Sequence, residues 1–266
     1  MKKILTTAIL CAGLVGFTAC DSFLDEDPKS SLTLDTYYKT SADIIGNVNY
    51  LYRDGAPDKM GNMTGAYRGS SLSVMNMVTG YFVNEYEGQE VDCSYARQLT
   101  RQDFTQSCCN YLTNDTWKSC YKSINVANAV IKYVDGVEMD NQAQYKAEAR
   151  FFRALNYFYL VKMFGDVPMV TEPTEDATLV EYPTRTAASE VFNTVIIPDL
   201  QFAVENLPNA TFAGNSHRVT KYAADMLLAD VYMRLGEYAN AVTPLKDVIN
   251  SGKFALATND NLAEGS

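Results

Sequence analysis

The chain has 266 residues, of which 47% are hydrophobic and 20% are charged, a composition that fits a folded globular protein and excludes a disordered one. Its formal net charge of −10 argues against nucleic acid or an anionic lipid surface as a partner, because both are bound by clustered Lys and Arg. The single histidine, His217, excludes most histidine-dependent catalysis and any multi-histidine metal site.

The first twenty residues have the pattern of an export signal. Two lysines follow the initial Met, and residues 4–17 form an apolar run that is short for a membrane span. The run ends in a small residue, Ala19, directly before Cys20, which resembles the lipobox of bacterial lipoproteins. In that motif the cysteine is acylated and becomes the mature N-terminus. We therefore expect a signal peptide over residues 1–19 and lipidation of Cys20; the alternative is an ordinary signal peptide cut after Ala19.

The folded part of the chain is expected to begin after an acidic linker over residues 20–34. The pattern predicts a first helix over Asp35–Arg53, with Thr33 or Asp35 as its N-cap. Its apolar face is expected to consist of Ile44, Ile45, Val48 and Leu51.

Residues 84–114 keep neither a helical nor a strand period, so they are predicted to form a long irregular loop. Its tyrosines are suited to stacking on the C–H faces of sugars, whereas packing in a half-buried position is the alternative. Four carboxylates have the hard oxygens that calcium prefers, but they lack the spacing of a known calcium loop. They are Glu85, Glu87, Glu90 and Asp92, and we expect solvated side chains and no metal there.

Four cysteines lie in or near this loop without any C-x-x-C spacing, so structural zinc is not expected. Export would permit disulfides, for example from Cys93 or Cys108 to Cys120. Buried thiols are the alternative, and the pairing of Cys93, Cys108, Cys109 and Cys120 stays open.

Two long helices are predicted in the middle of the chain. The first covers Trp117–Tyr133, and the second covers residues 141–163 and should return antiparallel. The second carries two apolar stripes, which indicates burial on more than one side. Gly165 is expected to end it with a positive φ, and Pro168 should force an extended exit over Val167–Thr171.

A further helix is predicted over residues 186–207, with Thr186 as its N-cap and Leu207-Pro208 at its end. Pro198 should bend or restart this helix, because it removes one donor and crowds the preceding turn.

The region 220–250 has the spacing of a tetratricopeptide repeat, a pair of helices that cross closely at small residues. The matching residues are Leu228, Ala229, Tyr232, Gly236, Tyr238, Ala241 and Leu245. Because a lone repeat cannot bury its own face, other helix pairs must stack on it. The sequence therefore predicts a mainly α fold of tetratricopeptide-like helical repeats with long irregular loops over residues 35–266.

Four separate motifs carry a family resemblance. They are C-x-x-x-L-D-x-x-P from Cys20, W-x-x-x-Y-x-x-I-N-x-x-N from Trp117, A-x-x-x-R-A-x-x-Y-x-x-L with F-G-D-V-P from Ala149, and R-x-x-x-x-E-V-F from Arg185. Together they resemble the SusD/RagB family of outer-membrane nutrient-binding lipoproteins. Members normally continue well beyond the 220–250 hairpin, so we expect a truncated SusD-like domain that lacks the C-terminal half.

The resemblance implies a lipid-anchored protein on the outer membrane, facing the cell exterior. It would bind oligosaccharides and deliver them to a SusC-like TonB-dependent transporter, without catalysis, cofactor or metal. Part of the family's ligand site comes from loops ahead of the Trp117 helix, so Tyr86, Tyr95 and Arg97 are the candidate ligand-binding residues. The alternatives are a non-catalytic scaffold that docks a transporter, and peptide uptake as in the RagB branch. A glycoside hydrolase is disfavoured, because carboxylate pairs are common in an acidic chain and none stands in the sequence context of a cleft. Motifs for nucleotide binding, a nucleophile elbow or a zinc protease do not occur either.

Overall fold

The computed structural model describes residues 34–54, 79–81, 98, 100–102, 115–175 and 183–256. The chain divides into two units, Met1–Tyr37 and Tyr38–Ser266. The first contains the short helix α2 (Leu34–Tyr37), and the second contains the other described helices.

The second unit is built from helices. Among its described helices, six have ten or more residues: α3 (Ser41–Asp54), α8 (Asp115–Tyr133), α9 (Gln142–Phe164), α11 (Ile197–Asn206), α12 (Lys221–Arg234) and α13 (Tyr238–Asn250). The shorter ones are η2 (Val134–Gly136), α10 (Ala188–Val191), η4 (Phe192–Ile196) and η5 (Ala213–Asn215). In the described part the only β pairing is an isolated antiparallel bridge between Val167 and Thr186. No helix there is both long and apolar enough to cross a bilayer. The predicted mainly α fold is confirmed.

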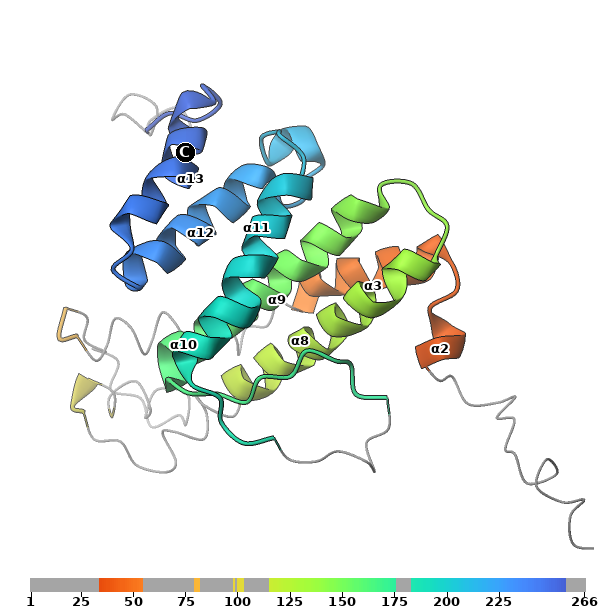
Figure 1. Cartoon of the computed structure of the whole chain (residues 1–266), viewed down its shortest axis with the longest axis horizontal. Coiled ribbons are helices and arrows are strands. Elements are labelled where there is room, and N and C mark those ends of the chain that lie inside the picture. Colours follow the sequence, from red (N-terminus) through yellow and green to blue (C-terminus); the bar gives the residue numbers. More distant parts are fainter. Residues whose placement is uncertain are drawn as a thin grey trace, which may run out of the picture. The chain divides into compact units, whose positions relative to one another are not determined.

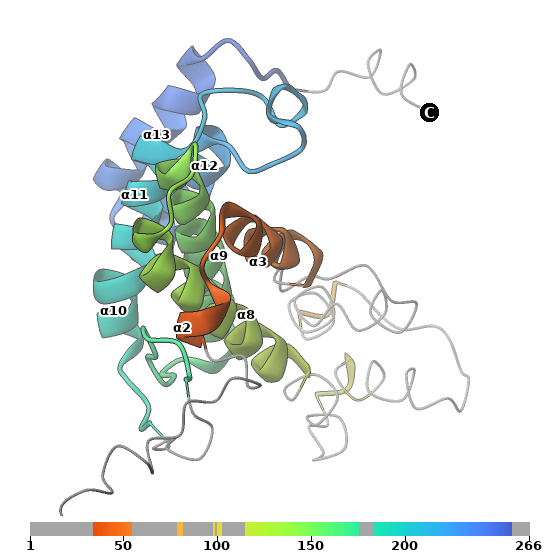
Figure 2. The same cartoon turned by 90° about the vertical axis from the view of Figure 1, so that its right-hand side faces the viewer.

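The helices stack in an order that follows the chain. In the second unit α9 packs against α8 and α11, while α3 lies across α8 and α9 (Figures 1 and 2). Helix α12 packs on α11, and α13 packs on α12 at the edge of the stack. This succession of paired helices is the arrangement that the repeat spacing predicts.

Helix α9 supplies the centre of the core, as its two apolar stripes predict. Its fully buried side chains include Tyr157 and Leu160, and each large apolar side chain buried in this way contributes ~1.5–3 kcal/mol. Gly165 then ends the helix at φ +68°, with its N–H donating to the carbonyl of Val161. Glycine reaches this conformation without the steric cost that a Cβ would add.

The predicted first helix is wrong in one respect, because the chain breaks it between Tyr37 and Ser41. Asp43 accepts hydrogen bonds from the Thr40 hydroxyl (2.7 Å) and from the Thr40 N–H (2.8 Å), which caps a new helix start. These bonds, that of the hydroxyl first, hold the pKa of Asp43 below its usual value. Thr33 and the side chain of Asp35, the two predicted N-caps, lie outside what the structure describes. The apolar face is confirmed: Ile44, Val48 and Leu51 are buried, and Ile45 is half-buried.

The sequence predicts Thr186 as the N-cap of the next helix, and this prediction is wrong. Its backbone pairs with Val167, N–H to carbonyl in both directions (2.9 and 3.1 Å), and the next helix begins at Ala188. The Ala188 N–H donates instead to the carboxylate of Asp166 at 2.9 Å. A side chain from the preceding connection thus accepts a hydrogen bond from a backbone N–H that the first turn of the helix leaves without a partner. The local sequence does not encode this contact.

The predicted interruption at Pro198 is confirmed. A π-helical turn, η4, directly precedes α11, and Pro198 occupies the first turn of α11. Proline is tolerated there because the N–H groups of a first turn have no intrahelical acceptor. The predicted end at Leu207 is confirmed as well.

The predicted hairpin at 220–250 is confirmed by α12 and α13. Gly236 makes the turn at φ +75°, and the small residues Ala229 and Ala241 are buried where the helices pack. Tyr232 and Leu245 are half-buried.

Candidate functional site

The predicted site residues lie outside the described residues. This holds for the lipidation site Cys20 and for the ligand candidates Tyr86, Tyr95 and Arg97. Cys93, Cys108 and Cys109 also lie outside, while Cys120 is buried in α8. The disulfide and the ligand residues therefore stay predictions.

The best-defined polar arrangement surrounds the exit segment, which we define as residues 165–175 after α9. Side chains of α8 and α9 bind its backbone. The Tyr121 hydroxyl donates to the carbonyl of Pro168 at 2.7 Å. The Tyr157 hydroxyl donates to the carbonyl of Val170 (2.8 Å) and accepts from its N–H (2.7 Å). The exit segment is therefore held along the two helices by side chains.

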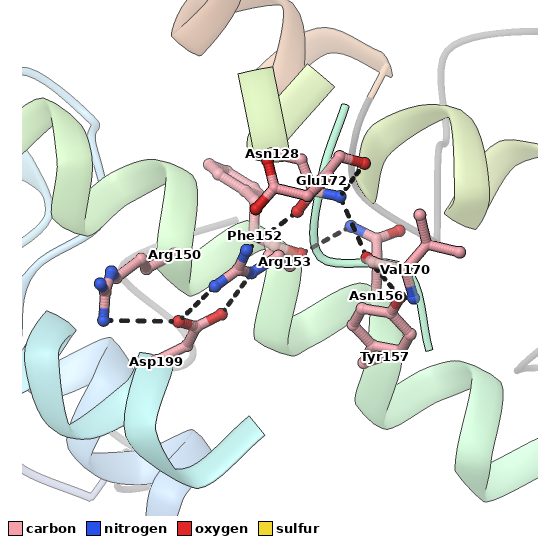
Figure 3. Close-up of polar contacts among 9 residues, drawn as sticks. All are labelled: Asn128, Arg150, Phe152, Arg153, Asn156, Tyr157, Val170, Glu172 and Asp199. Atoms are coloured by element: carbon pink, nitrogen blue, oxygen red, sulfur yellow. Dashed lines mark hydrogen bonds and ion pairs between the residues drawn. The ribbon is translucent and has the colours of Figure 1, made fainter. Parts of the chain in front are cut away.

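Asn128 of α8 connects the exit segment with the core, and Figure 3 shows its position. Its amide nitrogen donates to the carbonyls of Val170 (3.0 Å) and Glu172 (3.2 Å). Its amide oxygen accepts from Nη1 of Arg153 at 2.9 Å. Every polar atom of this buried side chain is used, which rigidifies the connection.

Arg153 continues this network into a buried ion pair with Asp199 of α11. Its Nε and Nη2 donate to the two carboxylate oxygens at 2.6 and 2.9 Å, in a bidentate geometry (Figure 3). Arg150 approaches the same carboxylate at 3.7 Å. The Asp199 side chain is 2% exposed, so the charge pair is shielded from water. Such a pair fixes the contact between α9 and α11. Removing either partner would leave an uncompensated buried charge and so destabilise the fold.

The hydroxyl of Tyr157 makes the stability of this arrangement depend on pH. Burial raises the pKa of Tyr157 to about 12, from an ordinary value of 10.0. The folded state therefore retains a proton that an unfolded tyrosine releases near pH 10. Its contribution to stability is fully present below pH 10 and is lost as the pH rises towards 12.

We expect the free energy of unfolding to fall between pH 10 and 12, by at most about 1.4 kcal/mol per pH unit for this one group. The Tyr157→Phe variant should lose part of that slope, and Tyr81→Phe, at an exposed tyrosine, should retain all of it. Denaturant unfolding measured from pH 9 to 12 checks this. An unchanged slope in Tyr157→Phe would contradict the assignment.

A second buried cluster joins α3, α9 and the connection before α12. Arg218 donates to both oxygens of Glu148, from Nε (3.0 Å) and Nη2 (2.5 Å). The Tyr52 hydroxyl donates to Glu148 (2.9 Å) and accepts from the Val219 N–H (2.9 Å). The guanidinium lies over the rings of Tyr52 and Tyr145, at 4.8 and 5.3 Å from their centres. Burial raises the pKa of Tyr52, so its hydroxyl stays protonated and keeps donating.

These two clusters are suited to holding connections in place. Both buried carboxylates, Glu148 and Asp199, are neutralised by arginine and hydrogen-bonded on both oxygens. Within the described ranges, no group of three His, Cys, Asp or Glu side chains is placed to hold a metal ion. Sequence reasoning did not identify either ion pair. The available signal was a charged residue within an apolar helical face, as at Glu148 and Asp199.

A family model described as "Starch-binding associating with outer membrane", of SusD-like proteins, matches residues 22–233. Among curated proteins, SusD-like protein P2 of Formosa agariphila is 29% identical over 254 residues. That match covers 94% of this chain and 47% of the relative.

Two solved structures of SusD-like proteins are also similar to this chain. A laminarin-binding SusD-like protein is 25% identical with a TM-score of 0.65, over 79% of this chain and 43% of its own. A SusD superfamily protein from Parabacteroides distasonis is 26% identical with a TM-score of 0.63, over 80% of this chain and 45% of its own. The chain thus spans less than half the length of these three relatives.

Proposed function

Because this chain belongs to the SusD-like family, we propose that it binds glycans at the cell surface and delivers them to a SusC-like, TonB-dependent transporter in the outer membrane. The observation that carries the proposal is the family match over residues 22–233. The likeness to a laminarin-binding protein supports a glycan ligand. In this function no covalent bond is made or broken.

The anchor in this proposal is an acylated Cys20. The family match begins at residue 22, which supports a boundary between the signal peptide (1–19) and the mature chain. Acyl chains at Cys20 would insert into the outer membrane, where each buried methylene contributes ~0.8 kcal/mol. The linker 20–34 would then separate the membrane from the helical domain 35–266.

Mass spectrometry of the mature chain from a host that acylates lipoproteins tests the anchor. We expect an acylated Cys20 at the N-terminus and recovery of the protein in the outer-membrane fraction. Cys20→Ser should remove both the acyl mass and the membrane association. A mature chain that begins with an unmodified residue would contradict lipidation and leave the glycan proposal to its own test.

The proposed ligand contacts are Tyr86, Tyr95 and Arg97. Isothermal titration of the full chain against laminarin and starch oligosaccharides should detect binding. Each Tyr→Ala change should weaken it about fivefold, since losing one stacked ring costs about 1 kcal/mol. Tyr81→Ala changes an exposed tyrosine outside the proposed set and serves as the matched control. No binding to any oligosaccharide would contradict glycan capture.

A second candidate is a non-catalytic scaffold that docks a transporter without a ligand site of its own. The tetratricopeptide-like hairpin of α12 and α13 favours it, because stacked repeats commonly present binding surfaces. Co-purification with the transporter in the absence of sugar affinity would support this alternative. Peptide uptake is distinguished by titration with peptides in the same assay.

A further inference from the structure

The exit segment is held through its backbone, and the groups that hold it are side chains. Besides the bonds that it receives from Tyr121 and Asn128, the Thr174 N–H donates to the amide oxygen of Asn125 at 2.7 Å. Tyr121, Asn125 and Asn128 follow one another at steps of four and three residues, so they share one face of α8. One face of this helix is therefore devoted to the backbone of the segment.

Little apolar surface fixes the exit segment. Among residues 168–175 only Pro173 is buried, and half of them are exposed. From residue 167 onwards, its backbone–backbone bonds within the described chain are limited to the pair between Val167 and Thr186. A segment with few buried apolar contacts and little regular pairing opens at a lower free energy than the helices beside it. The side chains of α8 and α9 therefore determine whether the segment stays closed.

The two asparagines of α8 bind the segment with opposite ends of their amides. Asn125 accepts through its oxygen, whereas Asn128 donates through its nitrogen to two carbonyls. An amide can serve in either orientation, so a neighbour has to fix the one that Asn128 adopts. Arg153 offers only donors, and its Nη1 lies 2.9 Å from the Asn128 oxygen (Figure 3). The amide nitrogen is thereby left to face the exit segment.

We propose that the exit segment is a strap that opens as one unit, and that Arg153 controls its opening by orienting the Asn128 amide. Arg153 is itself fixed by the bidentate pair with Asp199. The contact between α9 and α11 and the closure of the segment are therefore coupled through two side chains. In the open state the segment leaves α8 and α9, while the helices stay folded and the ion pair persists.

Asn128→Asp separates these two roles. The new carboxylate still accepts from Arg153, but it faces the two carbonyls of the segment with an acceptor in place of a donor. Amide hydrogen exchange of the full chain, followed by NMR at the Val170 N–H that donates to Tyr157, should accelerate about 25-fold, roughly fivefold for each hydrogen bond lost. Exchange at Thr174 should accelerate by the same factor, because the segment opens as one unit.

Asn125→Asp is the matched control, the same change three residues away on the same face. Its carboxylate accepts from the Thr174 N–H as the amide oxygen does, so exchange at Thr174 should be no faster than in the unchanged chain.

Denaturant unfolding separates local opening from global stability in Asn128→Asp. The free energy of unfolding should change little, because Arg150 and Arg153 together face only the carboxylate of Asp199 and can balance a second one.

Unaltered exchange at Val170 in Asn128→Asp would overturn the proposal, and an acceleration confined to Val170 would overturn opening as one unit. In the unchanged chain, exchange at Val170 as slow as at Leu160 of α9 would show that the segment does not open apart from the helices. Arg153→Met/Asp199→Leu removes the donor without leaving a buried charge, and exchange at Val170 should rise there about fivefold. No rise would overturn control by Arg153. None of these outcomes depends on glycan binding.

Discussion

Replacing Asp199 with alanine is expected to lower the free energy of unfolding by about 3–5 kcal/mol. The change removes the carboxylate that both Nε and Nη2 of Arg153 contact, and it leaves an arginine side chain that is 10% exposed without its counter-ion. The cost comes from stranding this charge in a medium of low dielectric constant. Chemical denaturation followed by circular dichroism measures the loss.

Two variants show whether the effect is specific to the buried charge. Glu205→Ala, at an exposed position of the same helix, should change stability by less than about 0.5 kcal/mol. The double variant Arg153→Met/Asp199→Leu should recover most of the loss, because no unpaired charge remains in the core. A loss below about 1 kcal/mol in Asp199→Ala would show that the ion pair does not stabilise the α9–α11 contact.

Glu148→Ala is expected to cost about 3 kcal/mol, because it removes the acceptor of both Arg218 and the Tyr52 hydroxyl. The Arg218 side chain is 21% exposed and can turn towards water, which makes this loss smaller than that at Asp199. The connection before α12 should loosen locally. Amide hydrogen exchange should therefore accelerate at Val219, whose N–H donates to Tyr52.

Glu138→Ala provides the comparison for this second cluster, since Glu138 is exposed and follows η2. Its unfolding free energy and the exchange rate at Val219 should match those of the unchanged chain. If Glu148→Ala leaves exchange at Val219 unaltered, the cluster does not hold the connection, whatever the global stability shows.

Helices were predictable wherever the signal was local. The stripes of α9, the positive φ of Gly165 and the small residues of α12 and α13 each depend on residues within a turn or two. The unpredicted break before α3 and the wrong N-cap at Thr186 both arose from capping contacts that the apolar pattern does not contain. Thr40 and Asp43 form a cap inside an otherwise continuous apolar pattern, and Asp166 caps the helix after Thr186 from 22 residues away.

The polar clusters were not predictable, because their members are distant in the sequence. Arg153 and Asp199 are 46 residues apart, and Glu148 and Arg218 are 70 apart. Spacing within a helix carries no information about a partner on another helix. Cys20, Tyr86, Tyr95 and Arg97 lie outside the described residues, so their roles stay predictions that depend on the family.

The amino-acid sequence by itself determined the helical class, most helix bounds and the family, because periodicity, breakers and motifs are properties of neighbouring residues. Only the tertiary structure decided which charges are buried and which backbone groups they hold. These depend on how helices meet in space. A charged side chain needs a specific partner only after packing against another helix has removed its hydrating water.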